Sequence, residues 1–448
     1  MKTWSNFIVL FMIVLFLVSQ ILTLTFLDWT LSGLSLIVML ISLIYSRQLP
    51  KWFSTVMIAI GSLILLNQQA GWDVWEEALT KNMPIVCLII VAPILSIPIR
   101  QGKYDEAIFS LVATFKGSIT LFFSFLLMLF NFIGPITNLG SIHIIHSMMN
   151  QLKLSKEFLA KVYTRGFSSI NTWSPYFASV LLVIYYLDIP ITRFLPYGLL
   201  LSFFQILLST VLFSLREAPS MTVCLPDAST AVRGRKLTEL SLVFAGLIGV
   251  IITLEPVVRV GVSVLVTITL MVFSVLWSVL QKRFKGFLKD MDEFRSNILP
   301  RQSNEISLFF SAGFFSVVLS GTAVADHLNL IWEQLADVSV FLLILFTIVL
   351  ISAFAFIGIH QIVVVSSILA SVSPVMISID DITFAMILLS AWAIGSVVSP
   401  VAPMNVISSN LLKVNVYRVI LKWNLRYAIL LIGIHTMLIY VVHLLLAV

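Results

Sequence analysis

Long apolar runs separated by short polar segments extend along this whole chain. Hydrophobic residues make up 59% of the 448 positions and charged residues only 11%, whereas a soluble domain carries about 25% charge. Since no soluble core could bury so much apolar side chain, we expect an all-α polytopic membrane protein, whose helices satisfy their own backbone groups in lipid. Runs long enough to cross a bilayer lie near residues 5–27, 31–46, 52–67, 84–99, 193–214, 238–254, 259–281, 304–321 and 427–447.

The polar segments between the runs alternate in charge, which predicts their side of the membrane. Basic segments, expected in the cytoplasm, lie at 47–51, 100–116, 233–236, 282–303 and 413–426, and acidic segments, expected outside, lie at 73–77, 326–337 and 380–381. The net charge of +6 therefore reflects orientation and not nucleic-acid binding. The first run lacks a small-x-small cleavage motif, so we expect a retained span in a bacterial plasma (inner) membrane, with a cytoplasmic N-terminus and an external C-terminus. Cys87 and Cys224 form neither a disulfide framework nor a metal site.

Three short sequence motifs recur in the same order half a chain apart. Phe132-Ile133-Gly134 recurs at positions 356–358, Leu95-Ser96 recurs at 319–320, and Ser174-Pro175 recurs at 399–400. Each match alone is weak in an apolar chain, but three at nearly one spacing indicate two structural repeats. Membrane transporters are often built from two such repeats, with the binding site where their broken helices meet.

Two longer regions, 117–187 and 338–412, are each expected to hold a re-entrant hairpin and a broken helix. Lys116 precedes the first hairpin, and Lys153, Lys156 and Lys161 follow it, so a simple crossing would put lysines on both sides. A hairpin at about 117–150, with its tip near 134–141, keeps them on one side, and Gly134 and Pro135 are expected to break the helix there. The second hairpin, at about 338–375, is expected to enter from the other side, with its tip near 356–360.

Each hairpin is followed by a helix with a predicted internal break. Ser155 and Asp380, at matching places in the two halves, are predicted N-caps of helices at about 155–187 and 380–412, which break at 168–175 and 395–403. The expected organisation is an extra N-terminal helix (1–30), a first repeat (31–214), a cytoplasmic linker (215–237) and a second repeat (238–448). This gives about eleven transmembrane helices plus two re-entrant hairpins, and about five crossings per repeat, an odd number that makes the repeats inverted. Segments 103–115 and 324–336 mix charge with large apolar residues and are expected to lie in the membrane interface.

The stretch from Asp380 to Asn405 carries a family resemblance. An acidic helix start and an apolar helix lead into Gly395–Asn405, which resembles the Gly-x-x-(Ser/Thr)-Pro-Pro-x-Gly-x-Asn stretch of the large membrane subunit of tripartite periplasmic-type carriers. Val401 stands where the second proline would fall, and Pro403 where the glycine would fall. With its architecture, the chain resembles the ion transporter superfamily of secondary carriers, which includes the divalent-anion/sodium symporters, although their Ser-Asn-Thr tip motif is absent. The resemblance implies elevator-type alternating access, an organic-anion or inorganic-ion substrate and a homodimer.

The tips and breaks supply polar groups at membrane depth. Carbonyls with hydroxyl or amide oxygens suit Na⁺, and helix N-terminal amides suit an anion. The polar side chains available there are Thr137, Asn138, Ser141, Ser168, Ser169, Asn171, Thr172, Ser174, Ser396, Ser399 and Asn405. We predict substrate binding by Arg165, Thr137, Asn138, Ser141, Asn171, Thr172, His360 and Asn405, and coupling-ion binding by Gly134, Ser174, Gly358, Ser396 and Ser399. The alternative is that these groups only satisfy bends or pack helices.

Arg165 and His360 carry the most specific predictions. A helix that starts near Ser155 at the inner surface places Arg165 roughly 15 Å deep, where a cation is costly and usually functional, and a guanidinium there is suited to gripping a carboxylate. The alternative is a later helix start, from which Arg165 reaches the cytoplasm. His360 is a candidate to carry a coupling proton, the alternative being a structural histidine. His143 and His146 lack a third ligand and make a poor metal site.

These expectations together describe a secondary active transporter and not an enzyme. It would move a small organic anion across the plasma membrane by alternating access, coupled to Na⁺ or H⁺ and without a cofactor. The alternatives are an ion exchanger or a carrier of a lipid-linked envelope precursor and, in a different class, a membrane enzyme of envelope glycan synthesis. Such enzymes usually have a large external loop with catalytic groups, whereas the external segments 68–83 and 322–337 are short and lack such a cluster. The expected partners are the anionic substrate, the lipid bilayer and a second copy in a homodimer, with no nucleic acid.

Overall fold

The computed structural model describes residues 3–446, except 23, 114, 116, 150–151, 153, 219–221, 224–233 and 259. Lys116, Lys153, Arg233, Cys224 and most of the predicted linker at 215–237 therefore lie outside the described residues.

Helices account for nearly all of the described chain. The first half contains α1 (Thr3–Ser19), α2 (Thr25–Tyr45), α3 (Gln48–Asn67), α4 (Trp72–Thr80), α5 (Met83–Val91), the 3₁₀ turn η1 (Ala92–Leu95), α6 (Ser96–Gly102), α7 (Tyr104–Ala113), α8 (Ile119–Thr137), α9 (Gly140–Met149), α10 (Lys156–Ile170), α11 (Ala178–Tyr186), α12 (Ile191–Leu212) and the π-helix η2 (Phe213–Glu217). The second half contains α13 (Gly234–Leu254), α14 (Val262–Leu280), α15 (Phe284–Glu293), η3 (Phe294–Ile298), η4 (Leu299–Gln302), α16 (Ser303–Ser320), α17 (Ala323–Val338), α18 (Val340–Phe356), α19 (Gln361–Ser371), α20 (Asp381–Val398), α21 (Pro403–Leu412), the π-helix η5 (Arg418–Asn424) and α22 (Leu425–Leu446). The short strands β1 (Gly117–Ser118) and β2 (Thr222–Val223) pair antiparallel.

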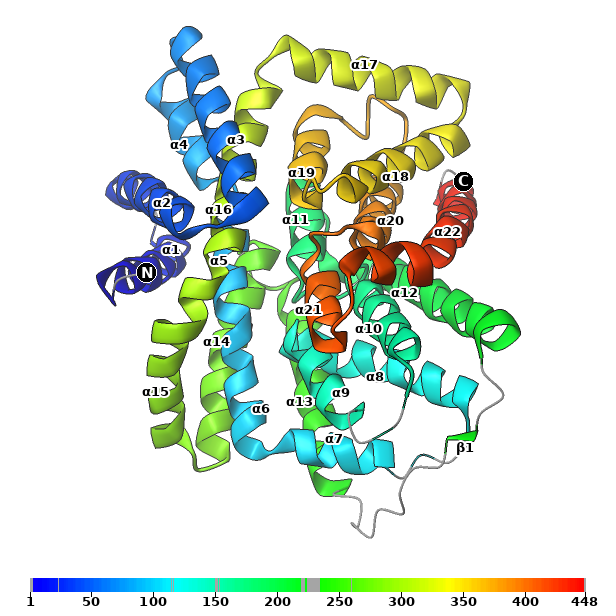
Figure 1. Cartoon of the computed structure of the whole chain (residues 1–448). Helices are drawn as coiled ribbons and strands as arrows, with labels where there is room; N and C mark the ends of the chain where they lie inside the picture. Colours follow the sequence, from blue (N-terminus) through cyan, green and yellow to red (C-terminus); the bar gives the residue numbers. More distant parts are fainter. Residues whose placement is uncertain are drawn as a thin grey trace.

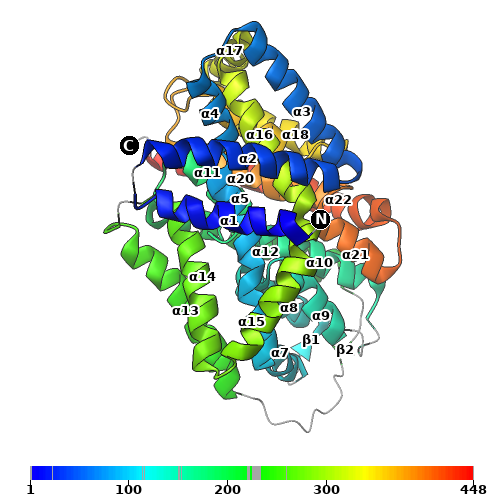
Figure 2. The same ribbon diagram turned by 90° about the vertical axis from the view of Figure 1, so that its left-hand side faces the viewer.

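The helices pack into one bundle, with α2, α3 and α4 on one side and α22 on the other in Figure 1, and Figure 2 shows the first of these sides from the front. α16 packs against α2, α3, α4 and α5 on one side and against α19 on the other. Buried polar contacts fix this packing: the Ser54 and Ser307 hydroxyls are 3.3 Å apart, and the Asn82 amide donates to the Phe309 carbonyl at 2.9 Å. The segments 103–115 and 324–336 correspond to the helices α7 and α17, which lie across opposite ends of the molecule in Figure 1.

Ten helical stretches in the described part of the chain are long and apolar enough to cross a membrane. The run at 5–27 does not form one long helix, because α1 ends at Ser19, beside Gln20, and α2 begins only at Thr25. The segment 68–83, expected to be a loop, contains α4, whose Ala78 and Leu79 are buried. The basic segment 282–303 is helical as well and continues into α16.

Two helix pairs occupy the positions predicted for hairpins: α8 with α9, and α18 with α19. The first pair turns at 138–139, within the predicted tip, but Gly134 and Pro135 do not end the helix. α8 continues to Thr137 because the Asn138 N–H donates to the Gly134 carbonyl at 2.7 Å and the Thr137 hydroxyl donates to the Ile133 carbonyl at 2.9 Å. In the second pair α18 ends at Phe356, and Gly358 adopts a φ of 98° in the turn, where a side chain would be strained. The two Phe-Ile-Gly copies therefore lie at different positions relative to their helix ends.

Two interrupted helices follow these pairs at the predicted places. α10 ends at Ile170 and α11 begins at Ala178, whereas α20 ends at Val398 and α21 begins at Pro403. Both predicted N-caps are confirmed: the Ser155 hydroxyl accepts from the Phe158 N–H at 3.1 Å, and the Asp380 carboxylate accepts from the Thr383 N–H at 3.0 Å.

Candidate functional site

One cavity of about 770 Å³ brings together both helix-pair tips and both helix breaks. It is lined by 137–140 and 360–361 at the tips, and by 176–179 and 402–404 at the breaks. These segments contain the N-terminal ends of α9, α19, α11 and α21. Several of the first N–H groups of α9, α19 and α21 donate to local acceptors, and Pro403 has none. The partial positive charge of the four helix ends remains, so their convergence favours an anionic group in the cavity.

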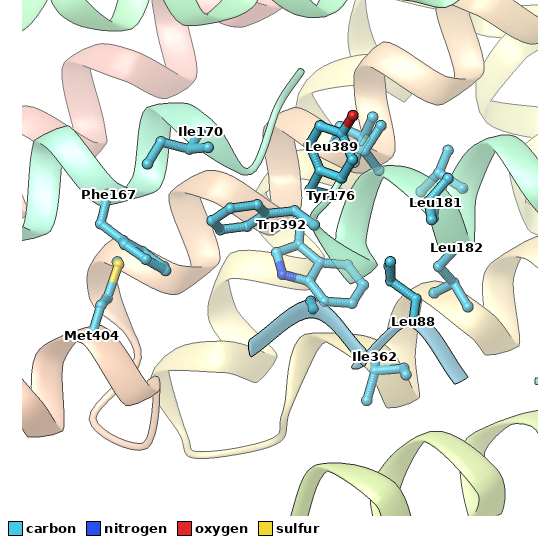
Figure 3. Packing of buried hydrophobic residues seen from close by; sticks show 14 of the residues in the cluster. Leu88, Phe167, Ile170, Tyr176, Leu181, Leu182, Ile362, Leu389, Trp392 and Met404 are labelled. Carbon is cyan, nitrogen blue, oxygen red and sulfur yellow. The ribbon is translucent and has the colours of Figure 1, made fainter. Parts of the chain in front are cut away.

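Aromatic and aliphatic side chains form much of the cavity wall. Figure 3 shows Trp392 amid Phe167, Tyr176, Leu88 and Met404, all of which line the cavity. The His360 ring, at the second tip, meets the Trp392 ring edge-on with centroids 6.3 Å apart. An apolar wall with a few placed polar groups is typical of a site for a small organic molecule.

Charged residues also line the cavity: Arg100, Asp105, Arg301 and Glu305. Arg100 is a half-exposed residue whose guanidinium lies 3.6 Å from the Asp290 carboxylate. The cavity thus extends to the part of the molecule that carries the basic segments around residues 100 and 301.

The structure brings five of the predicted site residues to the cavity: Thr137, Asn138, Asn171, His360 and Ser396. Within the described residues, the side-chain amides of Asn138 and Asn171 have no hydrogen-bond partner, which leaves them available to a ligand. The His360 Nδ1 accepts from the Ile362 N–H at 3.3 Å and caps α19. The predicted residues that do not line the cavity are Gly134, Ser141, Arg165, Thr172, Ser174, Gly358, Ser399 and Asn405.

Several hydroxyls near the breaks satisfy the local backbone. Ser168 donates to the Arg165 carbonyl at 3.1 Å, Thr172 to the Ser169 carbonyl at 2.8 Å, and Ser141 to the Asn138 carbonyl at 2.6 Å. For these three side chains the geometry matches the alternative expectation, that such hydroxyls only satisfy bends.

Arg165 lies in a largely buried ion network. Its guanidinium is 3.0 Å from the Glu217 carboxylate and donates to the Asn424 side-chain oxygen at 3.0 Å and to the Trp423 carbonyl at 3.2 Å. It also stacks over the Tyr427 ring at 4.8 Å. The Lys161 ammonium, expected from the sequence to mark the surface, is 3% exposed and lies 3.2 Å from Glu217. These contacts join α10 to the π-helices η2 and η5 and leave Arg165 buried inside the protein.

Sequence reasoning overlooked four residues of this region. Glu217 is the counter-ion of Arg165, while Glu305, Gln361 and Trp392 line the cavity. Glu305 was detectable in principle, as an acid inside the apolar run 304–321, and Glu217 as an acid just after the run 193–214. No sequence signal distinguishes Gln361 and Trp392, because their role depends on which helix faces meet.

No known family model matches this sequence, and no curated protein sequence matches it. The fold is similar to the crystal structure of the YdaH transporter of Alcanivorax borkumensis, with a TM-score of 0.63 over 88% of this chain and 97% of that one. The two chains share 14% sequence identity, so the likeness concerns the fold alone. The chain therefore has a transporter-like fold, and its ten long apolar helical stretches fit a multi-pass membrane protein.

Proposed function

We propose that this protein is a secondary active transporter of a small organic anion. The observation that carries the proposal is the cavity onto which the N-terminal ends of α9, α11, α19 and α21 converge. Four positive helix ends, two free side-chain amides and an aromatic wall match a ligand with an anionic head and an apolar body. We propose that the protein is a secondary carrier of the ion transporter superfamily and that Na⁺ or H⁺ is its coupling ion.

The proposed mechanism is elevator-type alternating access between two inverted repeats. Three features support it: the order of helix pair then interrupted helix occurs twice, the two N-caps stand at matching places half a chain apart, and α7 and α17 lie at opposite ends in Figure 1. The moving body would be α8–α11 with α18–α21, and the scaffold would be α2–α5 with α16. We further propose a homodimer in a bacterial inner membrane, with the present state open to the cytoplasm through the Arg100 and Arg301 end.

The geometry changes the role proposed for Arg165. With its guanidinium engaged by Glu217, Asn424 and Trp423, Arg165 is proposed to hold α10 in place and not to touch substrate. Substrate contact is instead proposed for Asn138, Asn171 and the α11 and α21 N-termini.

The test is ligand binding to the purified protein followed by uptake. Dicarboxylates, aromatic carboxylates, neutral amides of the same size and phospholipid-like precursors are screened by thermal shift, since a ligand that binds only the native state raises its melting temperature. We expect only the carboxylates to raise the melting temperature. We also expect carboxylate uptake into proteoliposomes, with a KM that Asn171→Leu raises at least tenfold. Asn410→Leu, on the exposed side of α21, is the matched control. Stabilisation by phospholipid-like precursors and not by carboxylates would favour the lipid-linked carrier instead.

A further inference from the structure

The C-terminal end of α20 carries a cluster of backbone carbonyls that proline deprives of their usual donors. In a continuous helix the carbonyls of Ser396 and Ser399 would accept from the N–H groups of residues 400 and 403. Both of those residues are prolines, Pro400 and Pro403, which have no N–H. The sequence therefore leaves two carbonyl oxygens without backbone donors at a negative helix end, in a buried position that would attract a cation.

The side chain of Asn405 occupies this position. Its Nδ2 lies 2.8 Å from the Ser396 oxygen, 2.9 Å from the Ser399 oxygen and 3.1 Å from the Val397 oxygen. Its Oδ1 accepts from the Thr164 hydroxyl of α10 at 3.2 Å, and both side chains are fully buried. A group surrounded by three carbonyl oxygens must be a donor or a cation, and here the amide nitrogen is that donor.

The first break solves the same problem in the same way. Pro175 deprives the Asn171 carbonyl of its donor, and the Ser179 hydroxyl of α11 donates to that oxygen at 3.0 Å. In each break, a side chain near the start of the second half-helix donates a hydrogen bond to a carbonyl that proline leaves without a backbone donor.

We propose that the Asn405 amide takes the place of a bound cation at the second break, so that this break closes without Na⁺. The amide nitrogen stands where a cation coordinated by the Ser396, Val397 and Ser399 oxygens would stand, and the two are mutually exclusive. This inference rests on the proposed transport function. It implies that a coupling ion, if Na⁺, binds at a position other than the second break. Its geometry is testable by cation binding alone.

The experiment measures melting temperature in NaCl against choline chloride at equal concentration. The wild type, Asn405→Asp, Asn405→Ala and the exposed control Asn410→Asp are compared at pH 8. In Asn405→Asp a carboxylate faces three carbonyl oxygens, so we expect a lower melting temperature than that of the wild type in choline chloride. Added Na⁺ should raise this melting temperature saturably. Acidification should raise it as well, because the protonated carboxyl group can donate a hydrogen bond. In the wild type we expect no rise of the melting temperature with Na⁺ that depends on Asn405. Asn410→Asp should not create such a rise.

The outcomes separate the two proposals. A saturable Na⁺ stabilisation of the wild type that Asn405→Ala abolishes would overturn the inference, because the cation would then occupy this position. Equal melting temperatures of wild type and Asn405→Asp in both salts would overturn it as well. If Asn405→Asp folds poorly, the yield of monodisperse protein with and without Na⁺ during purification gives the same comparison. Failure of transport alone leaves these binding results intact.

Discussion

The buried Arg165–Glu217 pair offers the sharpest test of how α10 is held. Both groups are removed from water, the arginine side chain completely and the glutamate side chain to 12% exposure. Their attraction offsets a large desolvation cost, so removing one partner leaves a buried charge without compensation. We therefore expect Arg165→Met to destabilise the protein strongly while leaving the cavity lining in place.

The size of the effect follows from the remaining contacts. Breaking a buried ion pair costs about 3–5 kcal/mol. Lys161 still lies 3.2 Å from Glu217 after the substitution, so part of the glutamate charge stays compensated. We expect the lower end, about 3 kcal/mol, for Arg165→Met, and a similar loss for Glu217→Gln. The double variant should lose clearly less unfolding free energy than the two single variants lose together, with a coupling energy of about 2 kcal/mol. The reason is that neither Arg165 nor Glu217 is then left as a buried charge without its partner.

The assay combines unfolding in detergent with uptake into proteoliposomes, normalised to folded protein. Arg235→Met is the matched control, since Arg235 pairs with Glu239 at 3.3 Å but is 94% exposed. An exposed pair of this kind contributes about 0.3–0.5 kcal/mol. We expect the control to unfold as the wild type does, and the KM of the residual Arg165→Met uptake to remain within about threefold of the wild type.

Two results would refute this reasoning. Additive effects of Arg165→Met and Glu217→Gln would show that the two groups do not form a coupled pair. An unchanged stability with a KM raised a hundredfold would return Arg165 to the substrate site.

Two further predictions follow from the packing and the proposed inversion. Gly198→Ala would place a Cβ 2.6 Å from the Thr172 backbone oxygen at the first break, so we expect a loss of about 1–3 kcal/mol in unfolding free energy, whereas Gly249→Ala, with open space around its Cβ, should be neutral or slightly stabilising. Single cysteines at the exposed positions Ser147, near the end of α9, and Val375, beyond α19, should react with impermeant thiol reagents from opposite sides of the membrane; reaction from the same side would contradict the inverted arrangement.

Much of the secondary structure was predictable because its causes are local. The N-caps Ser155 and Asp380 act within three residues, and Pro175 and Pro400 interrupt their helices wherever the rest of the chain lies. Local reasoning failed at Gly134 and Pro135, where the helix continues because later donors close its last turn. It also failed for α4, a short helix held by burial of one face.

The sequence by itself determined that this is a chain of long apolar helices, where two of them are capped and where those two are interrupted, since hydropathy, capping and proline act over a few residues. Only the tertiary structure decided which side chains face the cavity. Arg165 meets Glu217 across 52 residues, and Asn405 meets Thr164 across 241. The direction in which a side chain points depends on how each helix is rotated against its neighbours. That rotation is set by contacts between distant segments. Asn171 and Asn405 are both polar residues near a predicted break, yet Asn171 lines the cavity and the Asn405 side chain caps buried carbonyls of α20.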